Sequence, residues 1–504
     1  MVTVTLWQAQ ELNVHNRSDA IPEAQQMAVD IRELSTMDAT AQAELVRRKE
    51  LTPLELVDAA ISRIERINPT VNAVITPLYE EARAAAGSPD LPYGPFRGVP
   101  FLLKDLGAMQ KGQPCYMGNR ALRDAGFRSP FDTPLGARFR AAGFITLGKT
   151  NLPEFGLQST TQPLAFGATR NPWALDRSTA GSSGGSCAAV AAGMVPIAHA
   201  NDGGGSIRLP AAWCGLVGLK PSRGRISEPL DTFVIGELVV SRTVRDVAAV
   251  LDAVQGSEPG DLFMALPPAR SYRAEVGADP GKLRIGILTR PSFGDIHPEC
   301  LAGSQAAAKL LESLGHEVEE SYPEALLDPE LRERIAPLAR STFAGVIRVL
   351  SEILGRPTTR DDVEPYTWSA TELMPSVTAD EYLAAMQWLI GLWRRRVVQW
   401  WSGGFDLLLT PTIWEPPATL ESMMPVEDKW LELKAKIDRQ VFFTSPFNIT
   451  GQPAVSLPLH WTPEGLPVGI QLVAAIGRED LLIRVASQLE QARSWIDRRP
   501  PVHA

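Results

Sequence analysis

Two loops rich in serine and glycine lie close together in the chain, "AGSSGGSCAAVAAG" at residues 180–193 and "NDGGGSIRLPA" at 201–211. A serine hydroxyl attacks a carbonyl carbon only when a neighbouring base accepts its proton, and the usual base is histidine. His199 is near Ser206 in sequence, but it ends an apolar run, which is more typical of a histidine packed in a core. A Ser-His-Asp triad therefore has no suitable histidine here.

Lysine can replace histidine as the base, because burial disfavours the ammonium form and lowers the pKa. Lys104 closes the apolar run Val99–Leu103 and is the first candidate, while Lys149, in "GKTN", is a rival in a more polar turn. With a lysine base, two serines make sense as a proton relay, in which one serine passes the proton of the nucleophile to the lysine.

The glycines suit the same chemistry. Gly203, Gly204 and Gly205 precede Ser206, and without Cβ atoms their N–H groups can converge on a developing oxyanion. Gly181, Gly184 and Gly185 permit a tight turn around Ser182 and Ser183. Anion-binding loops and ordinary turns are the alternatives. Neither loop carries GxxxxGK[ST] or GxGxxG, so neither fits a phosphate-binding loop well. The residue types alone still leave ordinary turns as an alternative interpretation.

The elements that would hold these residues read as alternating strands and helices. "FRGVPFLLKDL" at 96–106 predicts a buried strand that ends at Lys104, and "GARFRAAGFITLGKTN" at 136–151 predicts a helix, a glycine turn and a strand. "LTPLELVDAAISRIERINP" predicts a helix with a capping box of Thr52 and Glu55. Such βα units indicate an α/β fold with a mixed, mostly parallel sheet flanked by helices.

No repeat or low-complexity linker divides the 504 residues, so we expect one large domain. Residues 322–440 are rich in helix signals and in tryptophan, and strand character returns at 405–412, within that region, and at 465–475. Hydrophobic residues make up 44% and charged residues 21%, which favours a globular protein. The net charge of −9 argues against a nucleic-acid partner.

Metal and disulfide chemistry are poorly supported. Cys115, Cys187, Cys214 and Cys300 are scattered without a CxxC pair.

The N-terminus has no signal-peptide pattern. The segment "AAMQWLIGLWRRRVVQWW" at 384–401 is better interpreted as a core helix with arginines reaching the surface than as a membrane-docking helix. We expect a cytoplasmic enzyme with no cofactor, no metal and no membrane partner; a homodimer stays open.

At the serine loops the chain resembles the amidase signature family, whose members cleave amide C–N bonds with a Ser-cis-Ser-Lys triad. "GVPFLLKD", "AGSSGGS" and "DGGGSIRLPAAWCGLVGLKPSRGRIS" resemble its three catalytic segments, and "GKTNLPEFG", "GATRNPW", "PFNITGQPAVSLP" and "GLPVGIQLVA" resemble further family blocks. The similarity runs over about 38–493, after an N-terminal lead at 1–37. Within the family, the chain looks most like hydrolases of cyclic nylon-oligomer amides and urethane-cleaving amidases.

The resemblance implies the roles of individual residues. Ser206 would be the nucleophile, Ser182 the bridging serine after a cis peptide bond, and Lys104 the base. Asp202 and Arg208 would brace the nucleophile loop, with Ser183 as further support, and the oxyanion hole would come from Gly203, Gly204, Gly205 and Ser206. Two positions depart from the family pattern: Ala180 replaces a common glycine, and Gly203 replaces a bulkier residue, which would widen the acyl pocket.

The substrate expected from these residues is an uncharged amide or carbamate. Leu157, Trp173 and Trp414 are the candidate pocket residues, and the 322–440 region would shape the pocket. The alternative function is that of a component of a glutamine-dependent amidotransferase that works with a tRNA-binding partner.

Overall fold

The computed structural model describes residues 33–227, 234–292, 294–372, 376–424 and 430–504. Most of the N-terminal lead expected over 1–37 therefore lies outside the described residues. The described part of that lead includes Leu34 and Ser35, and both already pack into the fold, because their side chains are buried.

The described strands form one 11-stranded sheet, which joins segments from both halves of the chain. In spatial order the strands are β1 (Val74–Pro77), β3 (Ile145–Thr150), β2 (Pro100–Lys104), β6 (Ile197–Asp202), β8 (Gly236–Ser241), β7 (Val217–Lys220), β12 (Ala454–Trp461), β13 (Pro467–Ala474), β11 (Leu407–Pro411), β9 (Arg284–Ile287) and β10 (Glu317–Glu320). A separate hairpin pairs β4 (Arg170–Asn171) with β5 (Ala174–Ser178).

The sheet is mixed, as the sequence predicts, but it is less parallel than expected. Strand β2 runs parallel to β3 and β6, and β9 runs parallel to β10 and β11. The pairs β1–β3, β6–β8, β8–β7, β7–β12, β12–β13 and β13–β11 are antiparallel. Antiparallel pairs therefore outnumber parallel ones, and two of them, β7–β8 and β12–β13, join consecutive strands with no intervening helix among the described residues.

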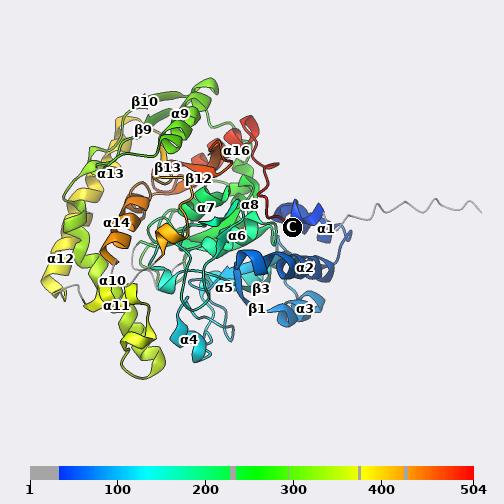
Figure 1. The fold of residues 1–504 in the computed structure, drawn as a ribbon. Helices are drawn as coiled ribbons and strands as arrows, with labels where there is room; N and C mark the ends of the chain where they lie inside the picture. Colours follow the sequence, from blue (N-terminus) through cyan, green and yellow to red (C-terminus); the bar gives the residue numbers. More distant parts are fainter. Residues whose placement is uncertain (1–32, 228–233, 293, 373–375, 425–429) are drawn as a thin grey trace, which may run out of the picture.

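Helices surround this sheet, so the α/β class is confirmed (Figure 1). They are α1 (Ala39–Arg47), α2 (Pro53–Val71), α3 (Tyr79–Gly87), α4 (Arg120–Asp124), α5 (Pro134–Ala141), α6 (Gly184–Ala191), α7 (Arg208–Cys214), α8 (Val244–Val254), α9 (Pro298–Ser313), α10 (Leu331–Leu354), α11 (Pro365–Glu372), α12 (Ala379–Trp388), α13 (Arg394–Gln399), α14 (Trp430–Gln440), α15 (Ser445–Thr450) and α16 (Glu479–Ala492). In Figure 1, α10 to α12 lie along one side of the molecule, and α1 to α3 lie on the opposite side.

Local sequence signals explain the elements next to the site. The capping box of Thr52 and Glu55 starts α2. Strand β2 is buried along its whole length and ends at Lys104, as predicted. Every residue of α6 is buried, because its glycines, alanines and serine allow other elements to approach closely.

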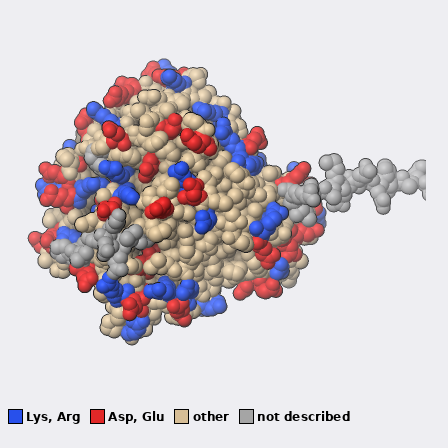
Figure 2. All heavy atoms as spheres, in the orientation of Figure 1, with Lys and Arg blue, Asp and Glu red and all other residues tan. Residues whose placement is uncertain are grey.

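The surface fits the acidic composition. On the face shown in Figure 2, basic and acidic side chains are interspersed around a broad area of uncharged residues, without a large cationic patch. The four cysteines are buried free thiols. Within the described residues, no helix is both long enough and apolar enough to cross a bilayer.

Candidate active site

Lys104 lies at the centre of the candidate site. Its side chain is buried, and Nζ lies 2.6 Å from Ser182 Oγ and 3.0 Å from Ser183 Oγ. Burial lowers the pKa of Lys104 to about 7, although the nearby acid Glu237 acts to raise it. At neutral pH a substantial fraction of this amine is uncharged, so it can accept a proton from a serine hydroxyl.

The loop before α6 presents Ser182 to Lys104. The Gly181–Ser182 peptide bond is cis, as the family resemblance implies. Ala180 adopts a left-handed conformation with φ 57°, which glycine would tolerate more readily, and its carbonyl accepts a 2.9 Å hydrogen bond from Thr161 Oγ1. The departure from glycine at this position therefore keeps the backbone shape that the loop needs.

Ser206 lies in the turn that joins β6 to α7, and the carboxylate of Asp202 fixes the backbone on both sides of it. Asp202 Oδ1 accepts a 2.6 Å hydrogen bond from Gly205 N, and Oδ2 accepts a 3.2 Å bond from Ile207 N. Ser206 itself is only half-buried, which leaves it more accessible than the enclosed Lys104 and Ser182.

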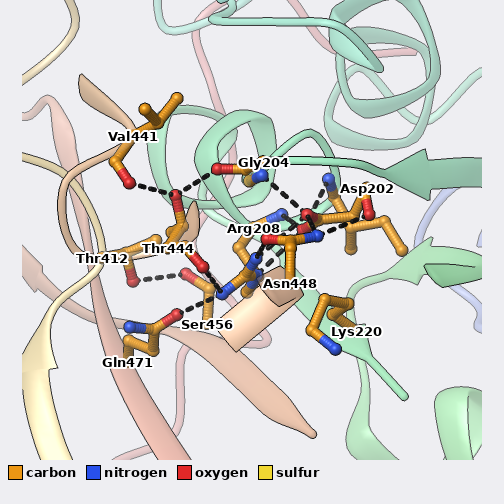
Figure 3. A network of polar contacts seen from close by, with 12 residues as sticks. Asp202, Gly204, Arg208, Lys220, Thr412, Val441, Thr444, Asn448, Ser456 and Gln471 are labelled. Carbon is orange, nitrogen blue, oxygen red and sulfur yellow. Dashed lines mark hydrogen bonds and ion pairs between the residues drawn. The ribbon is translucent and has the colours of Figure 1, made fainter. Parts of the chain in front are cut away.

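Arg208 holds Asp202 in place (Figure 3). Its Nε lies 2.8 Å from Asp202 Oδ2 and its terminal nitrogen 2.9 Å from Oδ1, and both side chains are fully buried. Burial alone would raise the pKa of Asp202, but Arg208 and Asn448 outweigh burial and hold it at about 2. Asp202 is therefore a carboxylate at every pH where an enzyme would work.

The expected oxyanion hole needs one correction. The N–H of Gly205 is donated to Asp202, so it is not available to a substrate oxyanion. Gly203 is exposed, and among the described residues a Cβ built there would meet Ile235 alone, at 3.9 Å. Among the four N–H groups of the turn, Gly203, Gly204 and Ser206 therefore remain as the candidate donors.

Leu157 lies beside the bridging serine. A Cβ built on its neighbour Gly156 would lie 3.2 Å from Ser182 Oγ. The Leu157 side chain packs against a buried apolar cluster of the 322–440 region, formed by Tyr366, Met423 and Leu433. The predicted pocket residue therefore adjoins both the serine loop and the helix-rich region.

The other two predicted pocket residues are held by contacts of their own. Trp173 donates a 2.9 Å hydrogen bond from Nε1 to Cys214 O at the C-terminal end of α7, whereas Ser206 precedes the N-terminal end of that helix. Trp414 is 6% exposed and packs in an apolar cluster with Trp393 and Phe443. The pocket role of both tryptophans stays a prediction.

The two rival bases do not reach the serines. Lys149 pairs with Leu103 in the parallel β2–β3 register, so it faces the side of the sheet opposite to Lys104. Its segment, "GFITLGKT" at 143–150, matches GxxxxGK[ST], but residues 145–150 form the buried strand β3 and not a phosphate-binding loop. His199 is fully buried and its Nε2 lies 3.2 Å from Glu237 Oε2.

Several residues of the site did not stand out in the sequence. Thr444 Oγ1 donates a 2.6 Å hydrogen bond to Gly204 O, and Asn448 Nδ2 donates bonds of 2.7 and 2.8 Å to the carbonyl and carboxylate of Asp202 (Figure 3). Asn201 Oδ1 accepts a 2.5 Å bond from Lys104 Nζ. The only sequence signal was position, since Asn448 lies in "PFNITGQP" and Asn201 precedes Asp202.

Comparison with known proteins places this chain in a family. The amidase family model matches residues 55–483. The 6-aminohexanoate-cyclic-dimer hydrolase of Pseudomonas sp. (strain NK87) is 45% identical over 477 residues, which cover 92% of this chain and 96% of that protein.

Solved structures agree with the sequence relatives. The structure of a 6-aminohexanoate cyclic dimer hydrolase complexed with substrate has a TM-score of 0.89 and 44% identity, and the match covers 93% of this chain and 100% of that chain. A glutamyl-tRNA(Gln) amidotransferase component from Thermotoga maritima is more distant, with a TM-score of 0.73 and 26% identity over 94% of this chain and 99% of that one. The chain belongs to the amidase signature family and is a hydrolase of amide C–N bonds.

Proposed function

We propose that this enzyme hydrolyses uncharged, largely apolar amides, linear or cyclic, through an acyl-enzyme on Ser206, and that the cyclic dimer of 6-aminohexanoate is among its substrates. Neutral carbamates belong to the same class, because their carbonyl carbon is attacked in the same way. The observation that carries the mechanism is the 2.6 Å contact between the buried Lys104 Nζ and Ser182 Oγ.

In the proposed reaction, Ser206 Oγ bonds to the substrate carbonyl carbon and its proton passes through Ser182 to neutral Lys104. The oxyanion is stabilised by N–H groups of the Gly203–Ser206 turn. The amine leaves with the proton returned by the relay, and water then cleaves the acyl-enzyme ester by the same path. No external acid or base is needed over the complete cycle.

The charge distribution supports neutral substrates. Arg208 is fully buried, and its donors are taken by Asp202, Thr444 O, Gln471 and Asn448, so it cannot bind a substrate carboxylate. Leu157 packs against the buried apolar side chains of Tyr366, Met423 and Leu433. Burying an unpaired substrate charge against such a surface is costly.

The relatives support the same substrate class. Two lines of similarity lead to hydrolases of the cyclic 6-aminohexanoate dimer, a neutral ring with two amide bonds, at 44–45% identity over nearly the whole chain. The amidotransferase component is similar at 26% identity, and the glutamine reaction is therefore an outcome to be tested.

A substrate competition tests this proposal. The kcat/KM values of the cyclic dimer of 6-aminohexanoate, 4-nitroacetanilide and an aryl carbamate are compared with that of free glutamine. We expect each neutral substrate to exceed glutamine by at least tenfold. A preference for glutamine of tenfold or more would refute the apolar pocket and favour the amidotransferase function.

Labelling of the nucleophile tests the mechanism separately. Phenylmethylsulfonyl fluoride should add one sulfonyl group to the intact protein, and peptide mass spectrometry should place it on Ser206. Ser206→Ala should take up no label, while Ser186→Ala, which changes a buried serine in α6, should still be labelled. A label on another serine would show that the nucleophile is wrongly assigned.

A further inference from the structure

The hydrogen bonds around Lys104 include one that the proton relay does not use. Besides Ser182 and Ser183, Nζ donates to Asn201 Oδ1 at 2.5 Å. Asn201 is on β6, one residue before Asp202, and it is 6% exposed. The two hydroxyls and this amide oxygen satisfy the three N–H donors of a lysine ammonium.

The orientation of the Asn201 amide is determined by its other contacts. Its Nδ2 donates to Leu106 O at 3.1 Å and lies 3.5 Å from Glu237 Oε1. A carbonyl and a carboxylate only accept hydrogen bonds, so the nitrogen must face them and the oxygen must face Lys104. Asn201 can therefore only accept a hydrogen bond from the lysine.

Ser183 is oriented in a similar way. Its hydroxyl donates a 3.1 Å hydrogen bond to the backbone carbonyl of Asn201. The hydroxyl hydrogen is thus used, and toward Lys104 the Ser183 oxygen can only accept.

These two directions determine how neutral Lys104 must be arranged. A neutral amine has two N–H donors and one lone pair, and the donors go to Asn201 Oδ1 and Ser183 Oγ. The lone pair is left for the third neighbour, Ser182 Oγ, which is the group whose proton it must accept. We propose that Asn201 and Glu237 are positioning residues, which aim the lone pair of Lys104 at Ser182 and set the pH at which the lysine becomes the base.

Strand pairing brings Glu237 to this position. Glu237 on β8 is the direct cross-strand partner of Asn201 on β6. Gly107 makes room for the pair, since a Cβ there would lie 2.3 Å from Glu237 Oε1 and 2.7 Å from Asn201 Nδ2. With φ +99°, this residue also occupies a conformation that favours glycine.

The other titratable groups that face Lys104 contribute less net charge. From β6, Asp202 is paired with Arg208, and burial lowers the pKa of His199 so that its imidazole is neutral. From α6, burial raises the pKa of Cys187 well above its usual value, so it is a neutral thiol. Glu237 on β8 is the acid with the largest effect in raising the pKa of Lys104.

The charge of Glu237 changes the pH at which Lys104 becomes neutral. The Glu237 carboxylate stabilises the Lys104 ammonium and therefore delays formation of the neutral base as the pH rises. Glu237→Gln keeps the shape and removes the charge, so the variant should reach its active form at lower pH. Asn201→Leu keeps the volume but removes the acceptor, so the lone pair is no longer aimed at Ser182.

The test measures kcat and KM for 4-nitroacetanilide, which is uncharged throughout, between pH 5 and 10. Glu237→Gln should move the rising limb of kcat/KM to lower pH by about one unit. Asn201→Leu should lower kcat by about 10- to 100-fold at the wild-type optimum, because the ammonium that Lys104 becomes on accepting the proton loses one hydrogen-bond acceptor, with KM changed less than threefold. Glu490→Gln, which removes a half-buried acid beside Val244, should leave the limb in place.

Since the inference rests on the proposed Ser206 mechanism, Ser206→Ala and Lys104→Ala are measured in parallel. Full activity in either would overturn that mechanism itself. If both are inactive, an unchanged or upward-shifted limb in Glu237→Gln overturns the charge effect. An effect of Asn201→Leu confined to KM, or no effect, overturns the orienting role of Asn201. Glu237→Gln and Asn201→Leu are separate tests, so one still gives a result if the other variant fails to fold.

Discussion

Replacing Arg208 with leucine should destabilise the protein in a way that depends on pH. The substitution removes the two bonds of 2.8 and 2.9 Å to Asp202 and leaves a fully buried carboxylate without its cation. Breaking a buried ion pair on one side costs about 3–5 kcal/mol of unfolding free energy. Gly205 and Ile207 would also lose a fixed acceptor, so amide hydrolysis should fall along with stability.

The pKa of Asp202 gives the direction of the pH dependence. In the wild type it is about 2, below the usual value of 3.8, which corresponds to about 2 kcal/mol of stability that is present above pH 4 and lost as the pH falls through 2. In Arg208→Leu, burial would raise the pKa of Asp202 above 3.8. The variant should then lose stability as the pH rises through that higher pKa, and the gap to the wild type should widen between pH 5 and pH 8.

Thermal unfolding followed by tryptophan fluorescence at pH 5 and pH 8 measures this gap. The double variant Asp202→Asn/Arg208→Leu should recover part of the loss at pH 8, because no charge stays buried. Arg273→Leu, at an exposed arginine, should change little at either pH. A loss in Arg208→Leu that is equal at both pH values and unrelieved in the double variant would refute the electrostatic explanation.

Three further results are expected. Ser206→Ala should abolish amide hydrolysis and keep the wild-type circular dichroism spectrum, and near-normal activity would exclude Ser206 as the nucleophile. Lys104→Ala should lose about 10²–10⁴-fold in kcat because the relay loses its base, whereas Lys149→Ala should lose less; the reverse order would show that the wrong lysine is assigned. Activity should rise with a limb near pH 7, set by the pKa of Lys104, and His199→Gln should keep that limb; its disappearance would point to a histidine base.

Burial changes the pH dependence that a lysine base would otherwise have. An unperturbed lysine would give activity that grows in the alkaline range, without a limb in the range of histidine. The enclosure of Lys104 brings its pKa to about 7, so a limb in the histidine range is expected from the lysine itself. Burial to this extent depends on elements far apart in the chain, including α6 and β8, and no local pattern around Lys104 reports it.

Local signals predicted much of the fold. The capping box of α2, the apolar run of β2 and the glycine turn before β3 are all properties of a few consecutive residues. The order of the strands was less accessible, and the mixed sheet has more antiparallel pairs than expected. Pairing depends on which strands meet in space, and paired strands such as β7 and β12 are separated by almost half of the chain.

The sequence by itself determined the family, the residues with chemical potential and the elements that carry them, because motifs, caps and apolar runs act over short distances. The tertiary structure alone decided that the Gly205 N–H is taken by Asp202, and that Asn201 and Glu237 lie beside Lys104. Hydrogen-bond direction and burial are set by atoms that approach from different strands and helices. Such contacts exist only after the sheet has formed, which is why residue types and spacing could not reveal them.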